Sequence, residues 1–247
     1  MAALLGPGSI EAQLPEVVRD SLPAQRISWE LVRVPAGIVV MDGDTVQVEE
    51  FLLGRTEVPW ELYDVFYLRF DLPRGERESV DTRLRPSRPY GAPDRGFGHR
   101  GYPAISLTHD ATRRFVAWLS ERTGNRYTLL TDAQWQRAAQ LGFPDGFDQA
   151  RGWVPTNSDA ATHPVGTAAP DALGVFDLLG NAAEWVVDAE GRPWLRGGSF
   201  SSETGAVSVD ARAAQQPSWN STDPQIPKSR WWLSDGPFAG FRLARIP

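Results

Sequence analysis

The sequence predicts an α+β fold in which an antiparallel sheet is accompanied by two main helices and much irregular coil. Short apolar runs separated by turn residues begin at Trp29 and are typical of antiparallel strands. Two later stretches carry helix-start signals followed by apolar residues at helical spacing. The chain has 247 residues, of which 41% are hydrophobic and 23% are charged, so it can bury a substantial core.

The first predicted elements are strands that follow a short N-terminal segment. We interpret residues 1–26 as an arm or linker that holds one short helix at most, and we expect a single domain over residues 27–247. Residues 30–34, 38–41 and 46–51 have strand-like patterns and are separated by turn residues at 35–37 and 42–44. A three-stranded antiparallel start is the simplest interpretation.

The first predicted helix opens at Pro59, since a proline in the first turn of a helix loses no hydrogen bond. It continues through Tyr63, Phe66, Tyr67 and Phe70, whose spacing gives one aromatic face. Such a face predicts core packing. Residues 71–100 are rich in Arg, Pro, Gly and Asp, and we expect them to form a long excursion over the surface.

The two main helices follow the excursion. One begins at Thr108 or Asp110 and runs to Arg122, with Gly124 placed to end it. The other begins with a capping box, in which the side chains of Thr131 and Gln134 satisfy backbone donors at the helix start. From residue 141 onward the sequence has many turns and few helical periods, which predicts irregular coil with short strands.

Composition excludes several classes of partner and chemistry. The net charge of −6 argues against nucleic acid, because phosphate binding needs a basic face. The absence of cysteine excludes disulfides and thiolate metal sites in this chain. We find no signal peptide and no apolar run as long as a membrane span, so we expect a soluble chain, and the sequence does not indicate its compartment.

Three blocks in the C-terminal part carry a family resemblance. They are Gly-Asn-Ala-Ala-Glu-Trp at 180–185, Arg-Gly-Gly-Ser-Phe at 196–200 and Gly-Phe-Arg-Leu-Ala-Arg at 240–245. In this order and spacing they resemble the formylglycine-generating enzyme family, also called the sulfatase-modifying-factor domain. The resemblance covers roughly residues 29–247 and implies that family's C-type-lectin-like fold.

The resemblance also locates the family's active site, and there this chain departs from the pattern. Family members that oxidise sulfatase cysteines hold copper with two cysteines, whose positions are occupied here by Ser202 and Val207. Glu203 matches the histidine that follows the first cysteine. Because a hydroxyl and an isopropyl group cannot replace thiolates that bind Cu(I), we do not expect copper-dependent oxidation. Ser199, Ser202 and Glu203 mark the active-site position without an assigned catalytic role.

A calcium ion is the metal that the resemblance does imply. Carbonyl and carboxylate oxygens around a glycine turn suit this cation. Carried over residue by residue, its ligands are the Asp177 side chain, the carbonyls of Gly180 and Ala182, and the Glu184 side chain. The alternative is that Glu184 pairs with a buried arginine, Arg196 or Arg242, while Asp177 caps a turn.

Other metal or nucleophile patterns are weak. His99, His109 and His163 lack the spacing of a metal-binding helix, and we expect them to be surface or capping residues. The sequence contains no glycine-rich phosphate loop and no Gly-x-Ser-x-Gly elbow.

The segment 215–237 combines aromatic residues with short polar side chains, which suits recognition of a protein, a peptide or a glycan. In lectin-like folds the loops before the final strand form the binding surface. One of the paired tryptophans is expected to face the core instead. The predicted ligand-binding residues are Trp219, Asn220, Asp223, Trp231 and Trp232.

Three functions remain open from the sequence. The first is a non-catalytic relative, a calcium-stabilised binding or scaffold module. The second is an enzyme with non-copper chemistry that uses carboxylates such as Glu203 or Asp210 in the same cleft. The third is a hypervariable lectin-like receptor, which the alanine-rich run at 211–214 disfavours because variable sites usually carry larger polar or aromatic residues.

Overall fold

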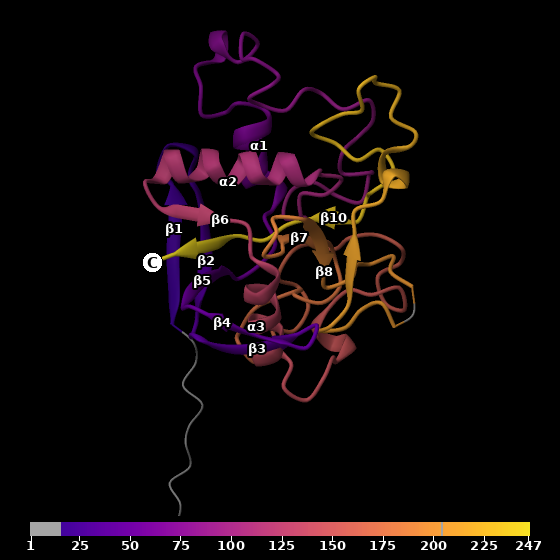
Figure 1. The fold of residues 1–247 in the computed structure, drawn as a ribbon. Coiled ribbons are helices and arrows are strands. Elements are labelled where there is room, and N and C mark those ends of the chain that lie inside the picture. The colour runs from indigo at the N-terminus through magenta and orange to yellow at the C-terminus, as the bar shows by residue number, and fades with distance from the viewer. Residues whose placement is uncertain (1–15, 204) are drawn as a thin grey trace, which may run out of the picture.

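A five-stranded antiparallel sheet lies at the centre of the molecule in the computed structural model, which describes residues 16–203 and 205–247 (Figure 1). Its strands are ordered β1-β2-β5-β11-β6, so the last strand of the chain pairs between two early ones. The strands span Val17–Leu22 (β1), Ile27–Val34 (β2), Phe51–Gly54 (β5), Ala244–Ile246 (β11) and Arg126–Thr128 (β6).

Three helices of the described residues cover this sheet, with α1 and α2 on one side and α3 on the other (Figure 1). The predicted capping box of α3 is confirmed: Gln134 N donates to Thr131 Oγ1 at 3.1 Å and Thr131 N donates to Gln134 Oε1 at 2.9 Å. Helix α2 ends at Gly124 as expected. The helices span Trp60–Tyr67 (α1), His109–Thr123 (α2) and Asp132–Gly142 (α3).

The central strands are buried on both faces, because successive side chains of a strand point to opposite sides. In β2, Trp29 and Leu31 join the core under α1 and α2, whereas Val34 joins the core under α3. In β5, Leu52 belongs to the first core and Leu53 to the second. The sheet is therefore the middle layer between two hydrophobic cores.

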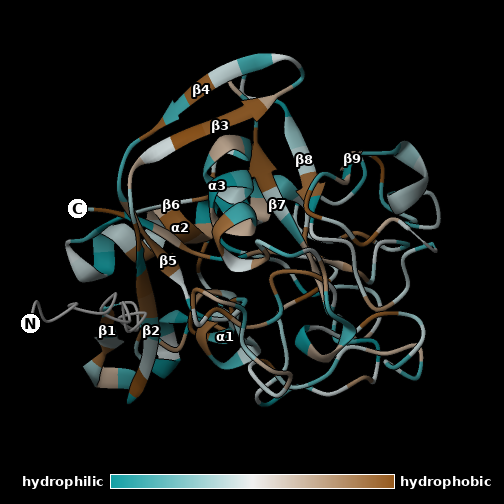
Figure 2. Ribbon diagram, turned by 90° about the horizontal axis from the view of Figure 1, so that it is seen from below, coloured by the Kyte–Doolittle hydropathy of each residue, from teal (hydrophilic) through white to brown (hydrophobic). Residues whose placement is uncertain are grey.

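A second sheet carries the loops of interest, and a separate hairpin covers α3. The second sheet has the order β10-β7-β8-β9, with β10 parallel to β7. Strand β3 of this hairpin consists mostly of hydrophobic residues (Figure 2). The bounds are Ala239–Gly240 (β10), Ala183–Val187 (β7), Pro193–Arg196 (β8), Arg212–Ala214 (β9), Gly37–Met41 (β3) and Asp44–Val48 (β4).

Three local expectations were wrong. Residues 17–22, assigned to an arm with a short helix, form the edge strand β1, while residues 1–15 of that arm lie outside the described residues. The expected three-stranded start does not form, because β2 pairs with β1 and β5 while β3 and β4 pair only with each other in the described sheets. Helix α1 ends at Tyr67 and does not reach Phe70, which is exposed.

The described helices include none that is long and apolar enough to cross a membrane.

Gly152 provides a test of the packing between the segment before β7 and the rest of the molecule. A Cβ atom on Gly152 would lie 1.9 Å from the backbone oxygen of Leu179, so something must move to admit it. We expect Gly152→Ala to lower the free energy of unfolding by about 3 kcal/mol in denaturant titration. In the control Gly75→Ala the new Cβ meets open space, and we expect a change within about 0.5 kcal/mol. Equal effects of the two substitutions would contradict this packing.

Candidate functional site

A cleft of about 400 Å³ opens beside the second sheet, at the position that the family resemblance assigns to the active site. Ala183 of β7 and Leu195 of β8 form its floor, and residues from the loop 198–213 form one wall. Trp219 and Phe238 form the aromatic part of the lining, with ring centroids 5.3 Å apart in an edge-to-face arrangement.

The Arg-Gly-Gly-Ser turn shapes this wall. Arg196 is buried with its guanidinium 4.4 Å from the ring centre of Trp135, which anchors the start of the turn. Gly198 has a φ of 66° and passes so close to Val207 that a Cβ would lie 2.8 Å from Cγ2 of that valine. The turn is closed by Ser199 N, which donates to Ser202 Oγ at 2.8 Å.

Three of the residues predicted at the active-site position are gathered here, and two are not. Ser199, Ser202 and Glu203 all line the cleft. Val207, at the second copper position, packs against the core that includes Trp135 and is not part of the lining. Asp210 is also absent from the lining, and its Oδ1 accepts from Gln136 Nε2 at 3.0 Å.

The described lining supplies hydroxyl groups and two charges. Ser199 Oγ lies 3.3 Å from Ser202 Oγ and 3.4 Å from Ser201 Oγ. The charged residues of this lining are Glu203, which is exposed, and Arg212, which donates to Asp132 Oδ2 at 2.9 Å. These groups can bind and orient a polar ligand, since each hydroxyl can donate and accept.

The three histidines lie outside the described lining of the cleft. His99 bridges two carboxylates, with Nε2 2.8 Å from Asp64 Oδ2 and Nδ1 3.0 Å from Asp94 Oδ2. His163 stacks on a tryptophan ring at a centroid distance of 3.8 Å, and His109 packs beside Trp185. The cleft therefore offers its serines no histidine base within the described lining.

Directly behind the cleft lies a buried ion pair. Ala183 faces the cleft, and the next residue of β7, Glu184, points into the core, where it is fully buried. Arg242 Nε donates to Glu184 Oε1 at 2.8 Å, and Trp135 Nε1 donates to Oε2 at 3.1 Å. Burial raises the pKa of Glu184, and the guanidinium acts in the opposite direction. This is the alternative partner weighed against calcium from the sequence.

Protein donors engage the carboxylate of Glu184, one of the predicted calcium ligands. Both of its oxygens accept hydrogen bonds, and the Arg242 guanidinium lies 2.7 Å from one of them. Asp177 Oδ2 accepts from Gly166 N, eleven residues earlier, at 2.8 Å, whereas its buried Oδ1 has no hydrogen-bond partner among the described residues. Within the described ranges, no group of three or more His, Cys, Asp or Glu residues is placed to hold a metal ion. Calcium at this position therefore stays a prediction from the family resemblance.

Burial raises the pKa of several carboxyl groups, and none of these groups belongs to the described lining of the cleft. In Asp171, burial raises the pKa to about 6, although the N–H groups of Val175 and Leu173 stabilise the charge of its carboxylate. Perturbed acids often mark active sites, and their positions here disfavour acid-base chemistry in the cleft. They are Glu57, Asp64, Asp171, Asp177 and Glu184.

The predicted ligand-binding residues are divided among different places. Trp219 lines the cleft, whereas Asn220, Asp223 and Trp232 line a second pocket that shares no lining residue with it. Trp231 is buried, and its indole N–H donates to the backbone oxygen of Thr82 at 2.9 Å. It thus holds the excursion in place.

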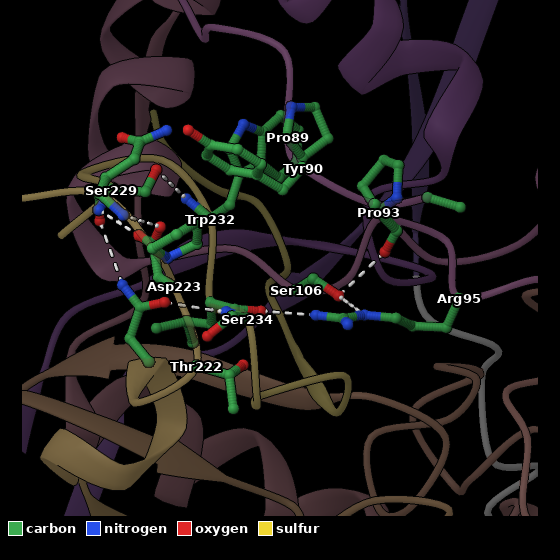
Figure 3. A pocket seen from close by; sticks show the side chains of 16 residues that line it. Pro89, Tyr90, Pro93, Arg95, Ser106, Thr222, Asp223, Ser229, Trp232 and Ser234 are labelled. Carbon is green, nitrogen blue, oxygen red and sulfur yellow. Dashed lines mark hydrogen bonds between the residues drawn. The ribbon is translucent and has the colours of Figure 1, made fainter.

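Sequence reasoning missed the part of the second pocket that comes from the excursion. Tyr90, Arg95 and Ser106 line it together with the predicted residues (Figure 3). Composition indicated a surface segment at 71–100, but no local pattern shows which distant loop that segment contacts. The indole of Trp232, which donates to the oxygen of Ser87 at 2.8 Å, is the contact that brings the two together.

Comparison with known proteins agrees with this architecture. A model of the sulfatase-modifying factor enzyme 1-like domain matches residues 18–224. Among solved structures, variable protein 1 of Treponema denticola aligns with a TM-score of 0.66 and 18% identity, over 93% of this chain and 99% of that one. PvdO from Pseudomonas aeruginosa aligns with a TM-score of 0.62 and 24% identity, over 88% and 94%. CarF aligns with a TM-score of 0.60 and 18% identity, over 88% and 98%. At these identities the likenesses show the fold alone.

A curated sequence relative is a much longer protein. The serine/threonine-protein kinase Pkn1 of Chlamydia trachomatis is 22% identical over 206 residues, which is 76% of this chain and 32% of that protein. The chain thus spans about a third of that relative's length, and the kinase activity in its name is not transferred here.

The buried pair yields a prediction for metal removal and mutation. We expect a chelator to leave the melting temperature unchanged, because protein donors already satisfy Glu184. Glu184→Gln would leave Arg242 buried without its closest anion and lower the free energy of unfolding by about 3–5 kcal/mol. The exposed control Glu190→Gln is expected to change it by less than about 0.5 kcal/mol. If calcium raised the melting temperature of the wild type but not of Glu184→Gln, the metal would replace the ion pair as the explanation.

Asp171 yields a prediction of pH dependence. Its pKa rises from 3.8 to about 6 on folding, so the folded state holds its proton more tightly than the unfolded state does. Stability from this group is fully present below 3.8 and is lost as pH rises to about 6. We expect Asp171→Asn, measured against wild type by denaturant titration, to gain up to about 3 kcal/mol in relative stability across that window. A constant difference between the two proteins would show that Asp171 is not perturbed.

Proposed function

Because the chain belongs to the family of sulfatase-modifying factor enzyme 1-like domains, we propose that it is a relative that binds ligands without copper chemistry and that its cleft receives a peptide segment. The observation that carries this proposal is the pair of residues at the family's copper positions. Ser202 stands in the cleft, hydrogen-bonded to Ser199 N, and Val207 packs into the core. Neither side chain supplies the thiolate that Cu(I) prefers, and the chain has no cysteine.

The lining of the cleft supports a peptide as the ligand. Trp219 packs against Phe238 and lies 6.0 Å from the ring of Trp185, so its indole is held in a fixed position. A rigid aromatic side chain beside hydroxyl groups is the combination that dominates many peptide and protein contacts. The volume of about 400 Å³ is in the range of small-ligand pockets and suits a few side chains of an extended segment.

An enzyme with non-copper chemistry is the alternative, and the observation that favours it is Glu203 in the same cleft as three serines. A serine nucleophile needs a base within hydrogen-bond reach that is itself held in place. The hydrogen bonds of the described residues join the serines to one another and to backbone N–H groups, and none joins a serine to the Glu203 carboxylate. Binding therefore has the stronger support.

Peptide selection tests the proposal. Peptides recovered from a random display library against the folded protein are expected to bind wild type and to lose about 30-fold in affinity to Trp219→Ala, since truncating a central aromatic residue costs about 2 kcal/mol. Phe70→Ala, which removes an exposed aromatic residue outside the described cleft lining, serves as the control and should leave affinity unchanged. Melting curves confirm that both variants fold.

Two outcomes would count against the proposal. Recovered peptides that bind Trp219→Ala as tightly as wild type would place their site elsewhere. Copper-dependent oxidation of a cysteine in a sulfatase-derived peptide by the purified protein would restore the family's oxidase chemistry despite the missing thiols.

A further inference from the structure

The second pocket, between the excursion and the loop 220–234, is separate from the cleft. It has a volume of about 270 Å³ and shares no lining residue with the cleft, so it stands independently of the proposed peptide site. Residues 89–93 form one wall, residues 222–225 form the opposite wall, and Trp232 lies in the lining between them (Figure 3).

One feature of this pocket is a cation that lacks an anionic partner in the described structure. Arg95 Nε donates to Ser106 Oγ at 2.9 Å, and Nη2 donates to the backbone oxygen of Leu233 at 2.6 Å (Figure 3). Both acceptors are neutral. Among the described residues, no carboxylate lies within ion-pair distance of this guanidinium. Partial burial lowers the pKa of Arg95, and the charge of Asp235, beyond ion-pair distance, acts in the opposite direction. The remaining donors of the guanidinium fork can bind a carboxylate.

Backbone strain gathers at the same place. Arg95 has a φ of 58° and Ser106 has a φ of 61°, in the left-handed region that non-glycine residues rarely adopt. The Ser106 hydroxyl also donates to the backbone oxygen of Pro93 at 2.9 Å, which ties the two strained segments together. Strained residues of this kind cluster at ligand sites, where the surrounding structure holds them in place.

The opposite side of the pocket is rich in oxygen acceptors. The hydroxyls of Thr222 and Ser234 donate to Asp235, at 2.7 and 2.8 Å, which leaves their lone pairs available for ligand donors. The Asp223 carboxylate accepts from the backbone N–H groups of Gln225 and Ser229 and so belongs to the loop's own structure. It carries a negative charge, which favours hydroxyl donors over a second anionic group at this end.

An exposed aromatic ring completes the lining. Tyr90 is 74% exposed and lies on the wall that faces the loop. An aromatic face in contact with solvent offers an apolar surface to a flat ligand at little cost in conformational entropy. Trp232, by contrast, is held by its bond to the oxygen of Ser87.

We propose that this pocket binds one carboxylated sugar unit, such as a uronic or sialic acid residue of a glycan. The carboxylate of the sugar binds the remaining donors of Arg95. The hydroxyls of the sugar donate to the oxygens of Thr222 and Ser234 and to the carboxylate of Asp223, and the apolar face of the sugar ring lies against Tyr90. A pocket of about 270 Å³ is at the lower end of the range for small ligands, which fits a single ring and not a drug-sized molecule.

Binding of D-glucuronate and of D-glucose, measured by isothermal titration and by ligand-observed NMR on the whole chain, tests the proposal. The two sugars share a ring and differ in the carboxylate. We expect saturable binding of glucuronate and at least tenfold weaker binding of glucose, because the charge-assisted bond to Arg95 is lost. N-acetylneuraminic acid serves as a second carboxylated probe.

Three single substitutions test the contacts that the proposal assigns to the sugar. Arg95→Gln should abolish the preference for glucuronate over glucose, and Tyr90→Ala, which removes a mostly exposed ring, should weaken both carboxylated sugars. Arg100→Gln, an exposed arginine outside the described lining of the pocket, is the charge-matched control and should keep wild-type binding.

Three outcomes would overturn the proposal: equal binding of glucuronate and glucose, no saturable binding of either carboxylated sugar, or retention of the preference in Arg95→Gln. Binding of N-acetyltyrosine without binding of the sugars would reassign the pocket to a peptide carboxylate. Failure here leaves the proposed peptide cleft untouched, because the peptide test is read from Trp219→Ala, and Trp219 does not line this pocket.

Discussion

The buried pair of Glu184 and Arg242 is the interaction on which the architecture depends. Besides Glu184, the Arg242 guanidinium donates to the backbone oxygens of Gly54 and Phe176, at 2.9 and 2.8 Å. One side chain thus connects the second sheet, the central sheet and the loop before β7. Trp135 of α3, which belongs to the core under α3, donates to the second carboxylate oxygen of Glu184. A buried charge is tolerated in a protein when hydrogen bonds compensate for its lost hydration, so these three segments must all lie close to the Arg242 guanidinium in the folded chain.

The buried ion pair and the lining of the cleft lie on opposite sides of β7. The buried pair of Glu184 and Arg242 lies behind β7, whereas the lining of the cleft in front of β7 combines hydroxyls, small side chains and aromatic rings with Glu203 and Arg212 as its charged residues. Of the family's two copper positions, Ser202 lines this surface, whereas Val207 is outside the described lining and packs, partly buried, against the core under α3. The Arg-Gly-Gly-Ser turn is held by protein contacts, namely the hydrogen bond from Ser199 N to Ser202 Oγ and the close packing of Gly198 on Val207.

The excursion forms part of the second pocket and is held there by two tryptophans. Trp231 and Trp232 are both buried, and each indole N–H donates to a carbonyl of the excursion, that of Thr82 and that of Ser87. The two indole hydrogen bonds therefore hold the excursion against the segment that contains Trp231 and Trp232, and so fix one wall of the second pocket relative to the other. Their sequence context suggested ligand contact, but only Trp232 belongs to a pocket lined by Arg95.

The sequence by itself determined the fold class, the capping box of α3, the end of α2 and the family, because these depend on local hydrogen bonding or on ordered blocks such as the one that ends in Glu184. Tertiary structure decided the rest. Strand β5 pairs with one edge of β2 and with the distant β11, so β1 pairs with the other edge of β2. The strands β3 and β4 pair only with each other in the described sheets. Whether Glu184 meets a cation or a metal depends on Trp135 and Arg242, which are 49 and 58 positions away, and whether Arg95 faces a pocket depends on Leu233, 138 positions away. Local patterns in the sequence do not identify such partners, because the contacts join segments that only the tertiary fold brings together.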